Sequence, residues 1–139
     1  MTKEDEITRN LTLIEYYKEQ LNAVDMQTQL MQAALADYHK AKITIEQLEK
    51  ADKNSEILIP IGGGTFINGS IKDASKILVD IGAGVVTEKT VDDAIKKINE
   101  RIENLQKNQE KLLSTAQKLQ AESVELSQKT QKLIEETKK

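Results

Sequence analysis

The sequence predicts a mainly α fold with a small β insert: a long antiparallel two-helix coiled coil with two β-hairpins between the helices. Apolar residues recur every seven residues in both outer segments of the 139-residue chain, which is typical of paired helices. All six glycines and the only proline lie between them, among alternating apolar residues. We therefore expect residues 1–53 and 90–139 to be coiled-coil helices and residues 54–89 to form the hairpins, together making one domain.

The first helix is predicted from an apolar seam that begins at Ile7. With Ile7 as heptad position a and Asn10 as position d, nine of the twelve a and d positions up to Ile45 are apolar. A repeat sustained over this length indicates a coiled coil rather than a single amphipathic helix.

The second helix carries an unbroken seven-residue repeat from Val91 to Leu133. The companion seam positions are aliphatic only as far as Ile102, and they become small or polar at Ser123 and Thr130. We expect the two helices to pair firmly near the insert and more weakly near the chain ends, because fewer aliphatic side chains are available there.

Capping signals mark where both helices begin and where the first one ends. Thr2 followed by Asp5, and Thr90 followed by Asp93, are N-terminal capping patterns. Asn54 follows the first helix, and asparagine readily takes the left-handed conformation that closes helices.

The insert is predicted to contain four strands. Two of them show the alternation of a strand with one buried face, at 57, 59 and 61 and again at 77, 79 and 81. Residues 65–71 and 85–88 supply their partners, and glycine-rich turns at 62–64 and 82–84 join each pair. Two-stranded hairpins are marginal in water, so we expect their apolar faces to need another chain. The candidate oligomerisation residues are Ile57, Ile59, Ile61, Phe66, Ile71, Ile77, Val79 and Ile81.

Several function classes receive no support from the sequence. Gly62-Gly63-Gly64 leads into a strand without the lysine of a phosphate-binding loop, so we expect no nucleotide cofactor. The chain has no cysteine and one histidine, His39, which predicts no metal site. The acidic pairs lie at helix ends or on exposed faces, where carboxylates more often serve as caps than as acid–base catalysts. We do not expect an enzyme.

The charge pattern also bears on partners and location. The 20 basic and 23 acidic residues are interspersed, which argues against nucleic acid as a partner, since phosphate binding needs clustered cations. We expect no membrane partner, because no apolar run approaches membrane-spanning length. A polar N-terminus and the absence of cysteine favour the cytoplasm.

Some apolar residues fall outside the seams, and antiparallel helices would gather most of them near the chain ends. They are either scattered surface side chains or part of a binding surface at the helix tips. The candidate binding residues at the tips, drawn from seam and off-seam positions, are Ile7, Leu11, Ile14, Val124, Leu126, Leu133 and Ile134.

The whole chain resembles the α class of the prefoldin family, most specifically in PIGGGTFINGSIKDASKILVDIGAGVVTEK at 60–89 and the following VDDA. The resemblance implies a hexamer of two α-class and four β-class subunits, in which the hairpins form a β-barrel platform. It further implies an ATP-independent co-chaperone that holds unfolded polypeptides at coiled-coil tips and delivers them to a group II chaperonin. The alternative is a structural coiled-coil adaptor that joins defined protein partners, and the range of proteins bound distinguishes the two.

Overall fold

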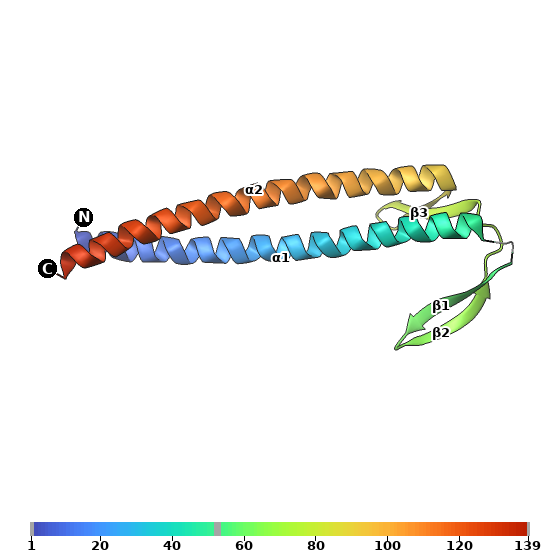
Figure 1. The fold of residues 1–139 in the computed structure, drawn as a ribbon, viewed down its shortest axis with the longest axis horizontal. Helices are drawn as coiled ribbons and strands as arrows, with labels where there is room; N and C mark the ends of the chain where they lie inside the picture. Colours follow the sequence, from blue (N-terminus) through green and yellow to red (C-terminus); the bar gives the residue numbers. More distant parts are fainter. Residues whose placement is uncertain (1, 52–53, 139) are drawn as a thin grey trace. The chain divides into compact units, whose positions relative to one another are not determined.

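A computed structural model describes residues 2–51 and 54–138 of the chain. The chain forms two long helices, one before and one after four short strands (Figure 1). The elements in order are α1 (Lys3–Lys50), β1 (Glu56–Gly62), β2 (Thr65–Ser70), β3 (Lys76–Gly82), β4 (Val85–Thr90) and α2 (Val91–Thr137). The predicted order of helix, two hairpins and helix is confirmed.

The chain divides into two compact units. The terminal unit comprises Met1–Ala34 and Leu105–Lys139, in which the first part of α1 and the last part of α2 run antiparallel. The hairpin unit comprises Leu35–Asn104 and contains the rest of both helices and all four strands.

The heptad seams coincide with the covered side of each helix. On α1 all twelve a and d positions from Ile7 to Ile45 are at least partly buried, including the polar Asn10, Thr28 and Lys42. On α2 the positions of the repeat from Val91 to Leu133, with their companions, are covered in the same way. Coiled-coil geometry therefore decides which positions are covered, whatever their chemistry.

The helix caps form as the sequence predicts. The Asp5 N–H donates to the Thr2 hydroxyl oxygen at 3.1 Å, and the Thr2 N–H donates to the Asp5 carboxylate at 3.2 Å. At the start of α2 the Asp93 N–H donates to the Thr90 hydroxyl oxygen at 3.2 Å. Asn54 has a φ of 68°, the left-handed conformation expected after a helix.

The strands form two separate antiparallel hairpins, β1–β2 and β3–β4, whose first strands and turns share an Ile-Leu pair, an isoleucine and two glycines at equivalent positions. Each has a bulge just before its turn, after Pro60 in one and after Asp80 in the other. Each turn needs positive φ, supplied by glycines except at Ala83, whose φ is 50°. β2 ends at Ser70, so Ile71 lies outside the strand predicted to include it.

The buried apolar core lies in the hairpin unit. Its buried members are Ile45, Val79, Val91, Ala94, Ile98 and Ile102. Partly buried side chains pack around them, from α1 (Leu35, Tyr38, Ala41), β3 (Ile77) and α2 (Ile95). The second hairpin, β3–β4, therefore contributes to the same core as the helix ends next to it.

Candidate functional site

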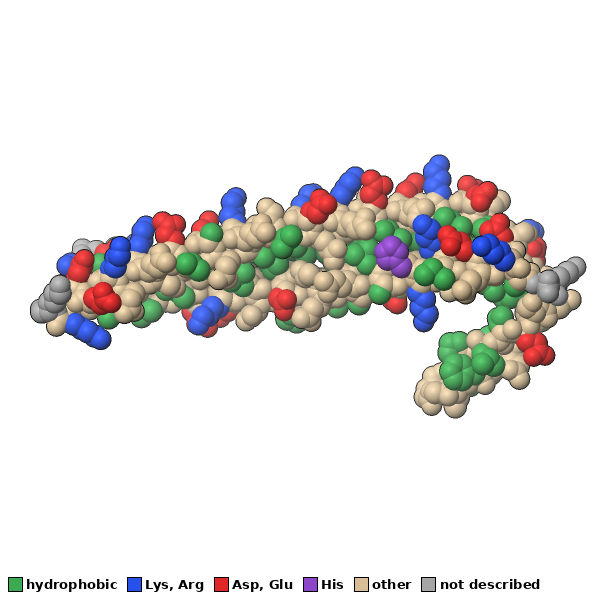
Figure 2. Space-filling view, viewed as in Figure 1, with side chains coloured by type: hydrophobic (Ala, Val, Ile, Leu, Met, Phe, Trp, Pro, Cys, Tyr) green, Lys and Arg blue, Asp and Glu red, His purple; other side chains and the backbone are tan. Residues whose placement is uncertain are grey.

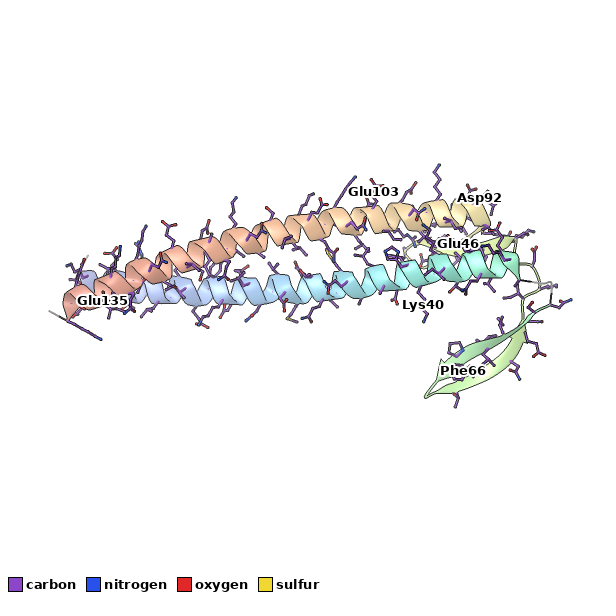
Figure 3. All side chains as sticks on the ribbon, in the orientation of Figure 1. Lys40, Glu46, Phe66, Asp92, Glu103 and Glu135 are labelled. Atoms are coloured by element: carbon purple, nitrogen blue, oxygen red, sulfur yellow. The ribbon has the colours of Figure 1, made fainter. Side chains whose placement is uncertain are left out.

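The first hairpin, β1–β2, leaves most of its apolar side chains uncovered. Ile59 is 44% exposed, and Ile61 and Phe66 are each 58% exposed. Figure 3 labels Phe66, which lies on β2. None of the described residues of β1 or β2 belongs to the buried core cluster. This hairpin therefore presents an uncovered apolar surface.

The second hairpin differs, and here one expectation is wrong. Val79 is only 7% exposed, and Ile77 packs against the same core as the helices. A single chain therefore does cover these two side chains, contrary to the expectation that all the alternating residues need another chain. The reason is that β3 lies against α1 and α2, whose Ile45 and Ile98 complete the cluster.

Arg101 on α2 fastens the second hairpin to the helices. Its guanidinium donates a hydrogen bond to the Asp80 backbone carbonyl at the bulge, and it lies 6.0 Å from the centre of the Tyr38 ring on α1. The Asp80 carboxylate in turn accepts a hydrogen bond from the Gly82 N–H at 2.8 Å. Sequence reasoning missed Arg101, because its role depends on β3 folding back onto α2.

Both hairpins also expose apolar residues that the predicted set omits. The omitted residues and their exposed fractions are Leu58 (65%), Ile67 (53%), Leu78 (72%), Val85 (55%) and Val86 (56%). The signal was present in the sequence, since leucine occupies the position between the alternating residues in both copies of the hairpin. A strand has two faces, and these strands are apolar on both.

The most deeply buried side chains of the terminal unit are polar. Asn10 is 6% exposed and Thr130 is 2% exposed, while no apolar side chain of this unit reaches full burial among the described residues. The Thr130 hydroxyl donates to the Leu126 carbonyl at 2.7 Å. At the outermost turn, Lys3 and Glu136 form an ion pair at 3.1 Å. The helix ends are thus paired at their outermost turn.

The predicted tip residues divide into exposed and partly covered groups. Leu11 is 51% exposed and Val124 is 45% exposed. The remaining residues, Ile7, Ile14, Leu126, Leu133 and Ile134, are partly buried between the helices. A groove of about 790 Å³ runs beside Val124, lined by Leu21, Ala116, Ala121 and several glutamines. The terminal unit therefore carries a modest apolar surface, and pairing of the helices covers part of the rest.

Tyr17 is the one titratable side chain with a clear perturbation among the described residues. It occupies a seam position on α1. Burial there, and next the neighbouring Glu122 carboxylate, raises the pKa of the Tyr17 phenol above its ordinary value.

The described residues offer no metal site. They contain no group of three histidine or carboxylate side chains that could hold a metal ion, and His39 is exposed on α1 (Figure 2). The triple glycine forms the β1–β2 turn, as predicted. No helix within the described ranges is both long enough and apolar enough to cross a membrane.

Comparison with known proteins gives consistent matches. The family described as Prefoldin subunit matches residues 17–136. The prefoldin alpha subunit of Archaeoglobus fulgidus is 33% identical over 111 residues, which is 80% of this chain and 81% of that protein. The prefoldin alpha subunit of Methanobrevibacter smithii is 30% identical over 111 residues, covering 80% of this chain and 75% of that protein.

A solved structure also shares the fold. A chain of the filamentous prefoldin from Methanocaldococcus jannaschii, determined by cryo-electron microscopy, superposes with a TM-score of 0.74. It is 19% identical, and the match covers 81% of this chain and 93% of that one. The arrangement of two helices around two hairpins is therefore a known fold.

Proposed function

The chain belongs to the prefoldin family, in its α class, and from that premise we propose that it is a subunit of an ATP-independent holdase. In this proposal its hairpins assemble with β-class subunits, two α-class chains with four of the β class. The assembled complex binds unfolded polypeptides and delivers them to a group II chaperonin in the cytoplasm.

The uncovered first hairpin carries the assembly part of the proposal. Ile59 and Val79 occupy equivalent places in the two copies of the hairpin, yet Ile59 is 44% exposed and Val79 only 7%. A two-stranded hairpin without a packed face is marginal in water. Strands of a neighbouring subunit would give Ile59 the cover that α1 and α2 give Val79.

The weakly packed terminal unit supports capture of unfolded chains. Its buried positions are Asn10 and Thr130, whereas the buried aliphatic residues among the described ones all lie in the hairpin unit. Each fully buried aliphatic side chain contributes roughly 1.5–3 kcal/mol. Local opening of the helices is therefore cheaper at the tips, and it would uncover Leu126 and Leu133 as a narrow apolar strip.

Reconstitution with a β-class subunit tests this function. The complex should suppress aggregation of several unrelated denatured proteins, followed by light scattering, without ATP. Removing residues 1–10 and 124–139 should leave the complex assembled but abolish suppression. Equal protection by the truncated complex would mean that denatured proteins bind elsewhere than at the tips. Magnesium-ATP should give no heat of binding, since the described turns lack phosphate-binding geometry.

A structural adaptor that joins defined partners remains the second candidate. The closed helix ends favour it, because a paired tip offers a fixed rather than an opened surface. An adaptor should bind one folded partner and ignore denatured proteins. Binding to many denatured proteins in the same assay excludes it.

A further inference from the structure

Helix α1 is apolar on two opposite sides. One side is the seam against α2. On the other side, Ala23, Met26, Leu30 and Ala33 follow one another at spacings of three, four and three residues, the spacing of a second seam. We call these four residues, with Tyr16 one heptad before Ala23, the outer strip. It lies wholly within the terminal unit.

The outer strip is uncovered. Leu30 is 71% exposed, Met26 is 66% exposed and Tyr16 is 51% exposed, and both alanines are exposed as well. Helix α2 has no counterpart among its described residues. Its exposed large apolar side chains, Leu113 and Val124, fall at different heptad positions.

Between Ala23 and Ala33 the surroundings of the outer strip are almost uncharged, whereas Glu15, Lys18 and Glu19 lie around Tyr16. From Gln20 to Ala36 the only charged residue is Asp25, in a chain of which 31% is charged. Figure 2 shows a corresponding stretch of α1 where green and tan surfaces are little interrupted by red or blue. A solvent-facing helix surface normally carries charge, so a neutral apolar stretch here indicates contact with something else.

A second copy of the chain does not fit the outer strip well. An antiparallel pairing that sets Met26 against Leu30 of the second copy would also set Glu19 against Asp37 of that copy. A parallel pairing would place each of these acids against its own equivalent. Like charges that face each other across an interface oppose association.

A folded partner with a stable interface does not fit either. The strip offers two large aliphatic residues, one tyrosine and two alanines, whereas stable interfaces use roughly 20–30 residues a side. Flexible methionine and the absence of charge suit contacts that do not discriminate between partners. These features fit a short apolar segment of extended polypeptide.

We propose that the outer strip is a second capture site for apolar segments of unfolded polypeptides. This inference rests on the proposed holdase function. From Tyr16 to Ala33 the strip is about 26 Å long at 1.5 Å per residue, which matches about eight residues of an extended chain. The strip is weak alone and acts together with the tip contacts of the same complex.

Photo-crosslinking in the reconstituted complex tests the site directly. A benzoylphenylalanine in place of Leu30 should crosslink to denatured proteins, as one in place of Leu11 at the tip should. The same probe in place of Ile43 is the matched control, because Ile43 is 54% exposed on α1 but lies outside the strip, beside Lys42. Crosslinking at position 30 no stronger than at position 43 would overturn the proposal.

A pair of glutamine substitutions tests the energetic role. The double variant Met26→Gln/Leu30→Gln should keep its helix content, since these residues have similar helix propensities, and should weaken capture about threefold through loss of one linked contact. Ile43→Gln should leave capture unchanged. Unchanged capture in the double variant would contradict the proposal. So would wild-type self-association in sedimentation that the variant abolishes, because a second copy would then be the occupant.

The same measurements separate this inference from the proposed function. If the wild-type complex captures no denatured protein, both the holdase function and the capture site at the outer strip are wrong. If it captures them and only the truncated tips matter, the holdase function holds and the strip alone is wrong.

Discussion

Ile59 and Val79 occupy equivalent positions in the two hairpins but lie in different environments. The residues before them match in the two hairpins, with Ile57-Leu58 in one and Ile77-Leu78 in the other. Only the second copy is covered by its own helices, so Val79 belongs to the chain's core and Ile59 does not. The same substitution should therefore affect different properties at the two sites.

Lysine at each position provides the test. Val79→Lys should destabilise the isolated chain by roughly 3 kcal/mol or more, because it buries an unpaired charge. Ile59→Lys should change that stability by less than about 0.5 kcal/mol, as exposed substitutions usually do, yet it should prevent assembly with the β-class subunit. Thermal unfolding and size exclusion measure the two effects. Normal assembly of the Ile59 variant would argue against the first hairpin as an interface.

Tyr17 gives a prediction at alkaline pH. Because its folded-state pKa is raised, the folded chain keeps the phenol proton at pH values where the unfolded chain loses it. Stability is thus fully present below about pH 10, the ordinary tyrosine pKa, and declines as the pH rises through the raised folded value.

Tyr17→Phe should therefore show a smaller loss of melting temperature than wild type between about pH 8 and about pH 10.5. Tyr16→Phe is the matched control, because Tyr16 is the neighbouring tyrosine and is 51% exposed. It should follow the wild-type dependence. A similar loss in all three proteins would show that the surroundings of Tyr17 do not raise the folded-state pKa of its phenol.

At the scale of elements, the seven-residue spacing predicted the covered side of both helices, even where the residue is Asn10 or Lys42. Local signals also predicted the hairpin turns, because positive φ leaves few residue choices. The docking of β3–β4 could not be predicted, since both hairpins begin with the same alternation of apolar residues. The residues that β3 packs against, Ile45 and Ile98, and the hydrogen-bond donor Arg101 come from the two helices and carry no local signal of this contact.

The attachment of the second hairpin through Arg101 can be tested by substitution. Arg101→Gln removes the charged donor to the Asp80 carbonyl and the contact with Tyr38. It should lower the free energy of unfolding by about 1 kcal/mol and speed amide hydrogen exchange in β3 more than in β1. Arg101→Lys keeps the charge but lacks the planar guanidinium, so it should recover only part of the loss. Equal exchange in β3 of all three proteins would mean that the core alone holds the hairpin.

Across the whole chain, the hairpin unit is firmly packed and the terminal unit is weakly packed. The hairpin unit contains every buried apolar side chain of the described residues, whereas the buried residues of the terminal unit are Asn10 and Thr130. A polar residue at a coiled-coil seam costs stability. In the proposed capture mechanism the helices separate at the tips while the hairpin unit stays folded. The reduced stability of the seam at the tips makes this separation easier.

Strengthening the tip seam should therefore improve stability and impair function. Asn10→Leu with Thr130→Val replaces two buried polar side chains by apolar ones of similar size, and should stabilise the chain by about 1–3 kcal/mol. Loss of the Thr130 bond to the Leu126 carbonyl costs little, because such bonds within a helix do not favour it. Assembly with the β-class subunit should not change, since both substitutions are in the terminal unit.

Capture by this stabilised complex should fall several-fold in the aggregation assay, because opening of the tips becomes more costly. Thr28→Val, also at a partly buried seam position but away from the tip, is the control, and should leave capture unaffected. If the double variant is more stable and still captures denatured proteins as well as wild type, the helices need not open. Capture would then belong to surfaces that are already exposed, such as Leu11 and the outer strip.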